Sequence, residues 1–383
     1  MKLTLCMPIA ETRGGAETLL ERLVHAAPAA GLDLSVVFLT DGPLANRLAE
    51  AGARTTVVNA GRLRDVGRMP AVVRAIAEAA RAHQSDAIFS WMTKAHLYAA
   101  PAALLTGRPA LWYQHGTPDP RDPVTRIATL LPAAGILACS DNVAQAQMAL
   151  RPHRQTRAVL PCVDLAAFDP LALPSPSDAR RQLGLPTSGP LVGMVARMQR
   201  WKGVHVYVDA MARVLSQRPS ATGVIVGGRH ALEPEYADAL DAQIDALGLR
   251  GRIRRVGFQP NVPLWMQAMD IVVHASDREP FGMVVIEAMA LGKAVVAGAD
   301  GGPCEIITEG HDGFLAPYGR DDILADRIAS LLTDPSLRNR MGAAARRRAA
   351  AFSTPAYASR FIDAVAHLLP RSLGTRSLTP SST

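Results

Sequence analysis

Hydrophobic and polar residues alternate along the chain in blocks that predict buried strands, each followed by an amphipathic helix. Short apolar runs rich in β-branched residues are typical of strands that are buried on both faces. Such runs recur at residues 3–8, 34–39, 54–58, 87–90, 110–114, 135–140, 191–195, 223–226, 255–258, 270–275 and 294–297. Alternating strands and helices fold into parallel sheets, because each helix carries the chain back to the same end of the sheet. The pattern therefore predicts an α/β protein built from doubly wound sheets.

The length and a change in composition near the middle of the chain predict two domains. A chain of 383 residues can bury two separate cores. Residues 159–176 are rich in proline, which is typical of a linker, so we place the boundary at about residue 170. We expect an N-terminal domain over 1–170, a C-terminal domain over 171–351 and a final helical segment over about 352–370. Residues 371–383, rich in Ser, Thr and Pro, are expected to form a flexible tail.

Charge and cysteine usage narrow the classes of partner and compartment. The formal charge of +7 suits anionic partners such as nucleotide sugars, lipid phosphates or a membrane surface. A nucleic-acid partner is not expected, because the run Arg346–Arg348 has no interleaved aromatic residues. The four cysteines are scattered without zinc-ligand spacing, which fits a reducing cytoplasm. We interpret residues 3–10 as a strand rather than a signal peptide, and 127–139 as too short to cross a bilayer. We expect a cytoplasmic protein.

The stretch from 276 to 292 carries the clearest candidate chemistry. A loop follows the predicted strand over 270–275 and leads into a helix, with Glu279 in the turn and Glu287 about two turns along the helix. Backbone N–H groups at a helix start have no intrahelical partner and attract anions; here they belong to Phe281, Gly282 and Met283. A diphosphate on these groups and a ribose diol on the deeper carboxylate would fit this layout. Alternatively, two glutamates at this spacing arise by chance in many helices.

Three other strand ends carry candidate residues. Arg197 and Lys202 follow the strand over 191–195, where two cations can converge on one diphosphate. A Gly14–Gly15 turn follows the first strand, and His115 follows the strand over 110–114. Taken singly, each also has a simpler interpretation as a solvated cation, an ordinary strand-to-helix turn or a packed histidine.

The sequence motifs in these segments resemble those of one enzyme family. E-P-F-G-x-x-x-x-E-A-M-A-x-G, over 279–292, resembles the E-x7-E signature of retaining glycosyltransferases of family 4. The segment R-x-x-x-x-K-G is similar to the family's G-R-x-x-x-x-K-G, with Ala196 in place of the first glycine. The resemblance covers most of the chain. It implies the GT-B fold, in which two Rossmann-like, doubly wound domains face each other across a cleft and the C-terminal helix packs back on the first domain.

The resemblance also implies an activity and a set of site residues. The expected reaction moves a sugar from a nucleoside-diphosphate sugar to a hydroxyl of a glycan, lipid-linked or small-molecule acceptor, with retention of configuration. The expected catalytic residues are His115, Arg197, Lys202 and Glu279. The expected donor-binding residues are Gly14, Gly15, Phe258, Pro280, Phe281, Gly282, Met283 and Glu287. The expected acceptor contacts, at strand ends of the first domain, are Glu11, Lys94, His96 and Thr117. No cofactor or metal is expected, because the sequence has no D-x-D motif or carboxylate cluster.

Two other interpretations of the function stay open at this point. One is a non-catalytic GT-B partner protein, and the other is a different GT-B enzyme such as a nucleotide-sugar epimerase. A further hypothesis concerns residues 61–83, whose five arginines could dock on an anionic membrane. Val72, Val73 and Ile76 would then form the apolar side of the docking helix. Alternatively, these three residues face the sheet and the arginines are solvated.

Overall fold

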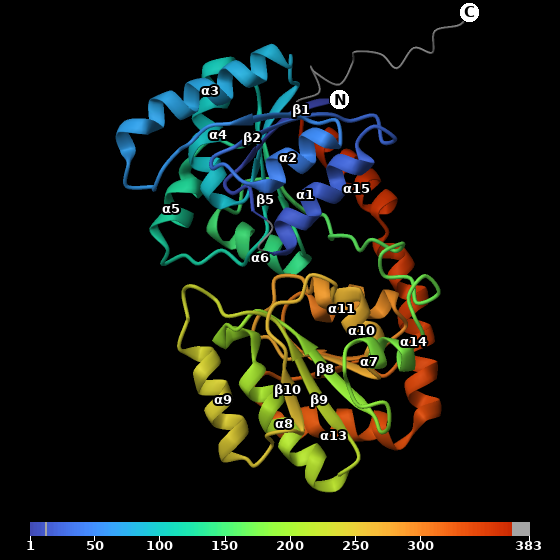
Figure 1. Ribbon diagram of the computed structural model, residues 1–383. Coiled ribbons are helices and arrows are strands. Elements are labelled where there is room, and N and C mark those ends of the chain that lie inside the picture. Colours follow the sequence, from blue (N-terminus) through green and yellow to red (C-terminus); the bar gives the residue numbers. More distant parts are fainter. Residues whose placement is uncertain (12–13, 370–383) are drawn as a thin grey trace, which may run out of the picture. The chain divides into compact units, whose positions relative to one another are not determined.

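The computed structural model describes residues 1–11 and 14–369, which fall into two compact units (Figure 1). Unit 1 contains Met1–Pro161 and the chain from Thr354 onward, and unit 2 contains Cys162–Ser353. The proline-rich segment from Cys162 onward therefore belongs to unit 2, whereas the predicted boundary was at about residue 170. Its contacts explain this assignment: Val163 N–H donates to Phe352 O at 2.8 Å, and Gln267 Nε2 donates to Pro170 O at 3.3 Å. The predicted tail over 371–383 lies outside the described residues.

The described part of unit 1 is organised around one parallel sheet. Its seven strands run in the order β3-β2-β1-β4-β5-β6-β7. Their bounds are β1 (Lys2–Met7), β2 (Asp33–Phe38), β3 (Arg54–Val57), β4 (Ala87–Trp91), β5 (Ala110–Gln114), β6 (Gly135–Ala138) and β7 (Thr156–Ala158). The sequence order reverses between β1 and β4, where Leu3 lies opposite Ala87. Ligands of open α/β sheets bind beyond the carboxyl ends of the strands at such a reversal.

Helices connect the strands of unit 1 and cover its sheet. They are α1 (Gly15–Ala26), α2 (Pro43–Glu50), η1 (Val66–Arg68), α3 (Met69–Ala82), α4 (Thr93–Thr106), α5 (Pro123–Leu130), α6 (Asp141–Leu150) and α15 (Thr354–Leu368). The last of these is the C-terminal helix, and it packs against α1 and β6. Its Phe361 ring lies 5.2 Å from that of Phe89, and Leu368 fills the space where a side chain at Gly135 would be.

The apolar side of α3 faces the core of unit 1. Val72, Val73 and Ile76 are all buried, whereas Arg74 and Arg81 are exposed. Burial supports the interpretation in which the three apolar residues face the interior, because they belong to the core of unit 1 and are not available as a membrane-docking side. The arginines alone remain available to an anionic surface. No helix within residues 1–11 and 14–369 has the length and apolar character needed to cross a membrane.

The described part of unit 2 has a second parallel sheet, with six strands in the order β10-β9-β8-β11-β12-β13. The strands are β8 (Leu191–Val195), β9 (Thr222–Val226), β10 (Ile253–Arg255), β11 (Ile271–His274), β12 (Ala294–Gly298) and β13 (Phe314–Ala316). The helices are α7 (Pro176–Gln182), η2 (Arg200–Lys202), α8 (Val204–Gln217), α9 (Tyr236–Ala246), α10 (Val262–Ala268), α11 (Met283–Ala290), α12 (Pro303–Ile306), α13 (Asp321–Thr333), α14 (Pro335–Ala349) and η3 (Ala350–Phe352). The strand order reverses between β8 and β11.

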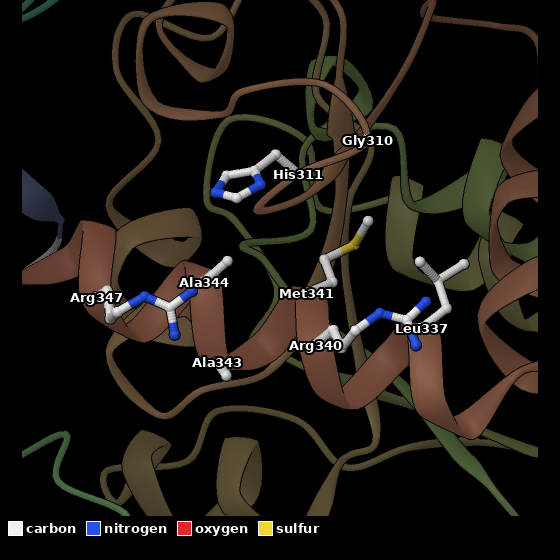
Figure 2. A pocket seen from close by; sticks show the side chains of 8 residues that line it. All are labelled: Gly310, His311, Leu337, Arg340, Met341, Ala343, Ala344 and Arg347. Carbon is white, nitrogen blue, oxygen red and sulfur yellow. The ribbon is translucent and has the colours of Figure 1, made fainter.

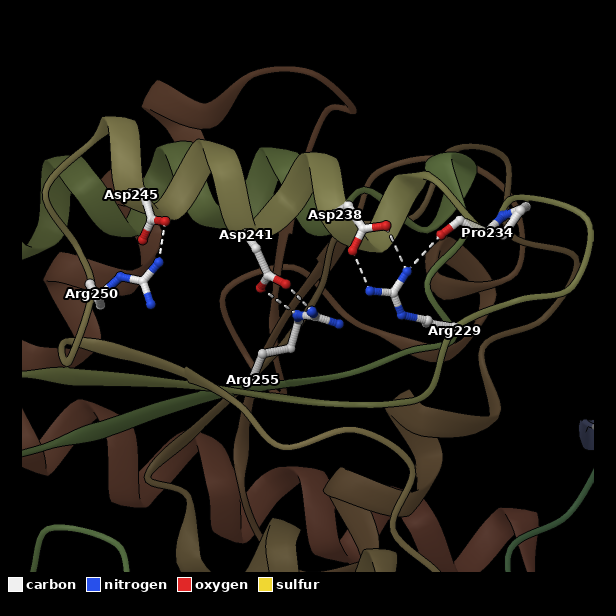
Figure 3. A network of polar contacts seen from close by, with 7 residues as sticks. All are labelled: Arg229, Pro234, Asp238, Asp241, Asp245, Arg250 and Arg255. Atoms are coloured by element: carbon white, nitrogen blue, oxygen red, sulfur yellow. Dashed lines mark hydrogen bonds and ion pairs between the residues drawn. The ribbon is translucent and has the colours of Figure 1, made fainter.

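Helix α9 packs beside α8, and ion pairs tie it to β10 and to neighbouring loops (Figure 3). Asp238, Asp241 and Asp245 point from one face of the helix toward arginines of neighbouring loops and strands. Their partners are Arg229, Arg255 and Arg250, respectively. Exposed ion pairs contribute at most about 1 kcal/mol each, so the network fixes the direction of α9 more than it stabilises the unit.

Candidate functional site

The strand reversal in unit 2 brings two loops together at the carboxyl ends of β8 and β11. The first loop follows β8 and ends in η2, and the second joins β11 to α11. Asp277 N–H donates to Trp201 O at 2.7 Å and ties the loops to each other. Gly203 allows this approach, since a Cβ there would lie 2.0 Å from Ala275 O. The two loops therefore form one site from residues about eighty positions apart.

The loops carry a buried chain of polar side chains. Lys202 Nζ lies 2.6 Å from Glu279 Oε2, and the two side chains are only 15% and 11% exposed. His274 Nε2 contacts the same carboxylate oxygen at 3.1 Å and lies 3.2 Å from Ser276 Oγ. The Lys202 ammonium also lies 3.9 Å from the centre of the Trp201 ring. The predicted catalytic residues Lys202 and Glu279 are thus in direct contact.

The backbone of Glu279 is held from the other side by a glycine turn. Gly302 N–H donates to Glu279 O at 2.8 Å. A Cβ at Gly301 would lie 2.2 Å from the same oxygen, and the φ of Gly301 is +78°, so only glycine fits there. Arg278, next to Glu279, has a φ of 42°. A non-glycine residue in this region costs of order 1 kcal/mol and persists where surrounding contacts enforce it, often at functional sites.

The two charges of the pair set each other's ionisation. Burial would raise the pKa of Glu279, but Lys202 and then His274 lower this pKa well below its usual range. Burial lowers the pKa of Lys202, while Glu279 opposes that shift and Arg197 reinforces it. Glu279 is therefore a carboxylate at neutral pH, and the charge of Arg197 is close enough to lower the pKa of Lys202.

The other predicted donor residues of unit 2 have different environments. Arg197 is exposed at the end of β8. Gly282 is the N-cap of α11, and Glu287, in the second turn of that helix, is half-buried. The Phe281 ring is buried against that of Phe352, at 6.1 Å between centres, so Phe281 offers its backbone rather than its side chain. Phe258 lies beside Gly228 and is 76% exposed, an unusual state for a large aromatic ring.

In unit 1, His115 is the first residue after β5. Its ring packs against those of Tyr113 and Trp91, with ring centres 4.2 Å and 5.0 Å away. Burial lowers the pKa of His115 to about 3, so the imidazole is neutral. Nε2 is buried and has no hydrogen-bond partner among the described residues. Leaving such a group unpaired costs about 1–3 kcal/mol.

The glycine turn of unit 1 lies near the same strand ends. Gly14 is the N-cap of α1, and Gly15 is the first residue of that helix. The indole N–H of Trp91 donates to Ala16 O at 2.9 Å, so the first turn of α1 is anchored to the end of β4.

The four expected acceptor residues have different environments. Glu11 and Thr117 are exposed, and Lys94 is half-buried in the first turn of α4. His96 is fully buried, stacked on Trp112 at 4.8 Å and bonded to Ser90 Oγ at 2.9 Å. The expectation for His96 is wrong, because its side chain is part of the core of unit 1. The sequence placed it in a loop, whereas α4 begins at Thr93 and turns the histidine inward.

Comparison with known proteins shows the family. Residues 177–348 match the family model described as "Glycosyl transferases group 1", and residues 13–167 match the one described as "Glycosyltransferase Family 4". The chain belongs to the glycosyltransferases of family 4 type. Its two parallel-sheet units are the Rossmann-like domains of the GT-B fold, as the sequence predicted.

Two glycosyltransferases are similar to about half of this chain. It is 32% identical to the D-inositol 3-phosphate glycosyltransferase of Corynebacterium urealyticum over 227 residues, which are 58% of this chain and 54% of the relative. It is 35% identical over 175 residues to the lipopolysaccharide core biosynthesis mannosyltransferase LpcC of Rhizobium leguminosarum bv. viciae, covering 46% of this chain and 49% of that protein. The chain thus spans about half the length of the curated relatives that it matches.

A solved structure is similar to this chain over nearly its whole length. Anabaena HepE, crystallised with UDP and glucose, has a TM-score of 0.84 and 28% identity and covers 96% of this chain and all of that one. The sucrose-phosphate synthase of Thermosynechococcus elongatus, with a TM-score of 0.80 and 23% identity, shares the fold. It covers 96% of this chain and 98% of that protein.

Unit 2 also has a pocket that lies apart from the Lys202–Glu279 pair. This pocket of about 360 Å³ lies on unit 2 between α14 and the turn at Gly310 and His311 (Figure 2). Arg340 and Arg347 are among the residues that line it, and it includes none of the predicted site residues.

Within the ranges that the structure describes, no group of three or more His, Cys, Asp or Glu side chains could hold a metal ion.

Three residues of the site, His274, Ser276 and Trp201, were not among the predicted site residues. His274 was counted only as a strand residue, although it is the last residue of β11 and directly precedes the Glu279 loop. A polar side chain at the carboxyl end of a buried strand is the signal that could have identified it.

Proposed function

We propose that this chain transfers a glycosyl group from a nucleoside-diphosphate sugar to a hydroxyl acceptor, with retention of configuration and without a metal. The observation that carries the proposal is the Lys202–Glu279 pair at the β8–β11 reversal, with Arg197 exposed beside it. Glu279 balances the charge of Lys202, so Arg197 and the N-terminus of α11 leave an excess of positive charge. Such a site suits a diphosphate.

Unit 2 would hold the donor. Arg197, the N–H groups near Gly282 and the remaining donors of Lys202 would bind the diphosphate, since an ammonium has three N–H bonds. Among the described residues, both side-chain contacts of Glu279 go to Oε2. Oε1 would accept a hydroxyl of the donor sugar. Glu287 would bind the ribose, and the exposed Phe258 ring would stack on the base.

The chemistry follows from these roles. The bond between the anomeric carbon and the leaving diphosphate breaks, and the acceptor oxygen forms a new bond to that carbon from the same face. The acceptor's proton passes to the leaving phosphate oxygen. Negative charge grows on the diphosphate as the bond breaks, so preorganised cations beside it lower the barrier, typically by about 3–4 kcal/mol for one donor.

Unit 1 would contribute the neutral His115 and the acceptor contacts. A neutral imidazole can bind a sugar hydroxyl through Nε2 without placing a second cation in the site. Met92 to Lys94 and residues 117–122 are the partly exposed segments that we assign to the acceptor, in place of the buried His96. The nucleotide in the HepE structure supports a nucleotide-sugar donor for this chain as well.

The decisive experiment measures release of nucleoside diphosphate from a panel of nucleotide sugars, with and without candidate acceptors. A thermal-shift screen first selects the donors that stabilise the protein. We expect acceptor-dependent release and a product with the donor's anomeric configuration, read by NMR. Conversion of the donor without acceptor would favour an epimerase. Binding without any turnover would favour a non-catalytic partner protein.

We also propose weak contact with anionic membranes through the arginines of residues 61–83. Each arginine near such a surface contributes about 1 kcal/mol, and this attraction is lost with added salt. Sedimentation with anionic and neutral vesicles at low and physiological salt tests it. Pelleting with anionic vesicles only at low salt is expected, and no pelleting under any condition would refute the contact.

A further inference from the structure

His274 is a buried polar residue that none of the roles above uses. It is the last residue of β11 and is only 4% exposed. Its Nε2 lies 3.1 Å from Glu279 Oε2 and 3.2 Å from Ser276 Oγ. A carboxylate can only accept hydrogen bonds, so Nε2 must carry a hydrogen and donate it to Glu279. The contact therefore places a hydrogen on Nε2.

The other ring nitrogen has no competing partner. Nδ1 is buried and makes no hydrogen bond within the described part of the chain. His274 also lines a cavity of about 10 Å³, together with Gly298 and Tyr318. This space holds at most one water molecule. The ring is thus held by its surroundings and by Glu279, with no room for a charged group to move in and reorient it.

The hydrogen bond from His274 also affects the orientation of the Glu279 carboxylate in the Lys202–Glu279 pair. Glu279 Oε2 receives hydrogen bonds from two directions, from Lys202 in the first loop and from His274 in the strand. Two donors on one oxygen fix the rotation of the carboxylate and determine where the other oxygen points. A lysine alone could not do this, because its flexible side chain can follow the carboxylate.

We propose that His274 is a positioning residue that fixes the Glu279 carboxylate, and through it Lys202, for donor binding and transfer. The inference rests on the proposed function for its effect on turnover, but the contact itself does not. Small displacements of groups that act in the transition state reduce rates strongly. The loss of His274 should therefore lower kcat more than it changes the KM for the donor.

The matched variants are His274→Gln and His274→Met. The Gln amide nitrogen can occupy the place of Nε2 and still donate, whereas Met fills a similar volume without a donor. We expect His274→Met to reduce kcat by about tenfold to a hundredfold and His274→Gln to recover most of it. His153→Gln serves as the control, because it replaces an exposed histidine of unit 1 and leaves the contact between His274 and Glu279.

Two measurements do not depend on turnover. Long-range ¹⁵N–¹H spectra of the imidazole groups at pH 8.5 should show His274 as the Nε2–H tautomer, with the resonance assigned by its absence in His274→Gln. A double-mutant cycle with Glu279→Gln should show coupling of about tenfold in the unfolding equilibrium constant. The Nδ1–H tautomer, a cycle without coupling, or a wild-type kcat in His274→Met would each overturn the inference. A wild-type chain that releases no nucleoside diphosphate from any donor would instead overturn the proposed function.

Discussion

Replacement of Lys202 by methionine separates two consequences of the buried ion pair. Methionine has a similar length and no charge, so the variant leaves the Glu279 carboxylate buried with His274 as its side-chain donor. Removal of one partner of a buried pair typically costs about 3–5 kcal/mol, because the other charge stays buried. Side-chain exposures of 15% and 11% put this pair close to the buried case. We therefore expect unit 2 to lose about 3 kcal/mol of stability.

Urea unfolding measures this loss. With an m-value of about 2–3 kcal/mol/M, the transition of unit 2 should move to lower urea by roughly 1 M. The chain has two units, so the transition is followed by tryptophan fluorescence and by hydrogen exchange, and is not treated as one two-state step. Arg200→Ala is the matched control. Arg200 is an exposed neighbour whose main side-chain contact is the Tyr236 ring at 5.4 Å, so the control should lose less than about 1 kcal/mol.

A second variant distinguishes stability from catalysis. Adding Glu279→Gln to Lys202→Met removes the stranded charge and keeps an acceptor for His274, so at least half of the lost stability should return. Turnover should not return, because the cation that offsets charge on the diphosphate is still absent; we expect it to stay about a hundredfold or more below wild type. Arg197→Ala should show the same loss of turnover with an unchanged urea midpoint, since Arg197 is exposed.

The reasoning would be refuted by Lys202→Met with an unchanged urea midpoint, which would mean that the pair is not buried in solution. Near-normal turnover in both Lys202→Met and Arg197→Ala would refute the diphosphate role. Recovery of turnover together with stability in the double variant would show that Lys202 acts only by neutralising Glu279.

Three further predictions follow from the site and its surroundings. Transfer should survive excess EDTA, because cations of the protein take the part of a metal; complete loss of activity that magnesium or manganese restores would contradict this. Chimeras that exchange residues 92–94 and 117–122 with those of a related enzyme should change the acceptor and keep the donor, and a changed donor sugar would count against the assignment. Burial lowers the pKa of His96 from 6.5 to about 3, so below pH 6.5 the unfolded state binds the extra proton and stability falls as the pH falls. This costs unit 1 about 2 kcal/mol at pH 5, and His96→Phe, unlike the exposed-site control His153→Gln, should flatten the dependence between pH 7 and pH 5 in urea titrations.

The sequence by itself determined the fold class and the strand ends that carry chemistry. The apolar run over residues 191–195 coincides with β8, and that over 110–114 coincides with β5. Such runs can be recognised locally, because a strand buried on both faces is apolar at nearly every position. The loop that follows a parallel strand lies at the carboxyl edge of its sheet. Arg197 and Glu279 could therefore be assigned to that edge of the second sheet, and His115 to that edge of the first, without coordinates.

The sequence could not determine which way a side chain faces once its element is placed. His96 was assigned to an exposed loop, but α4 begins three residues before it and directs it against Trp112. The prolines near residue 170 indicated a boundary, but Gln267 bonds to Pro170 and Val163 bonds to Phe352, and these contacts hold the segment in unit 2. In both cases the deciding contacts join residues that are distant in the chain.

The ion pair at the centre of the site illustrates the same division. Spacing after a strand predicted that Lys202 and Glu279 both lie at the ligand-binding edge, but only the tertiary structure showed that they contact each other across 77 positions in the chain. It also showed that His274, which looked like one more strand residue, donates to the same oxygen. Periodicity reports on neighbours within a turn or a strand, whereas the partner of a buried charge depends on which loops the strand order brings together. The residue types at this edge can therefore be predicted from the sequence, whereas their pairing depends on the order of β8 and β11 in the sheet.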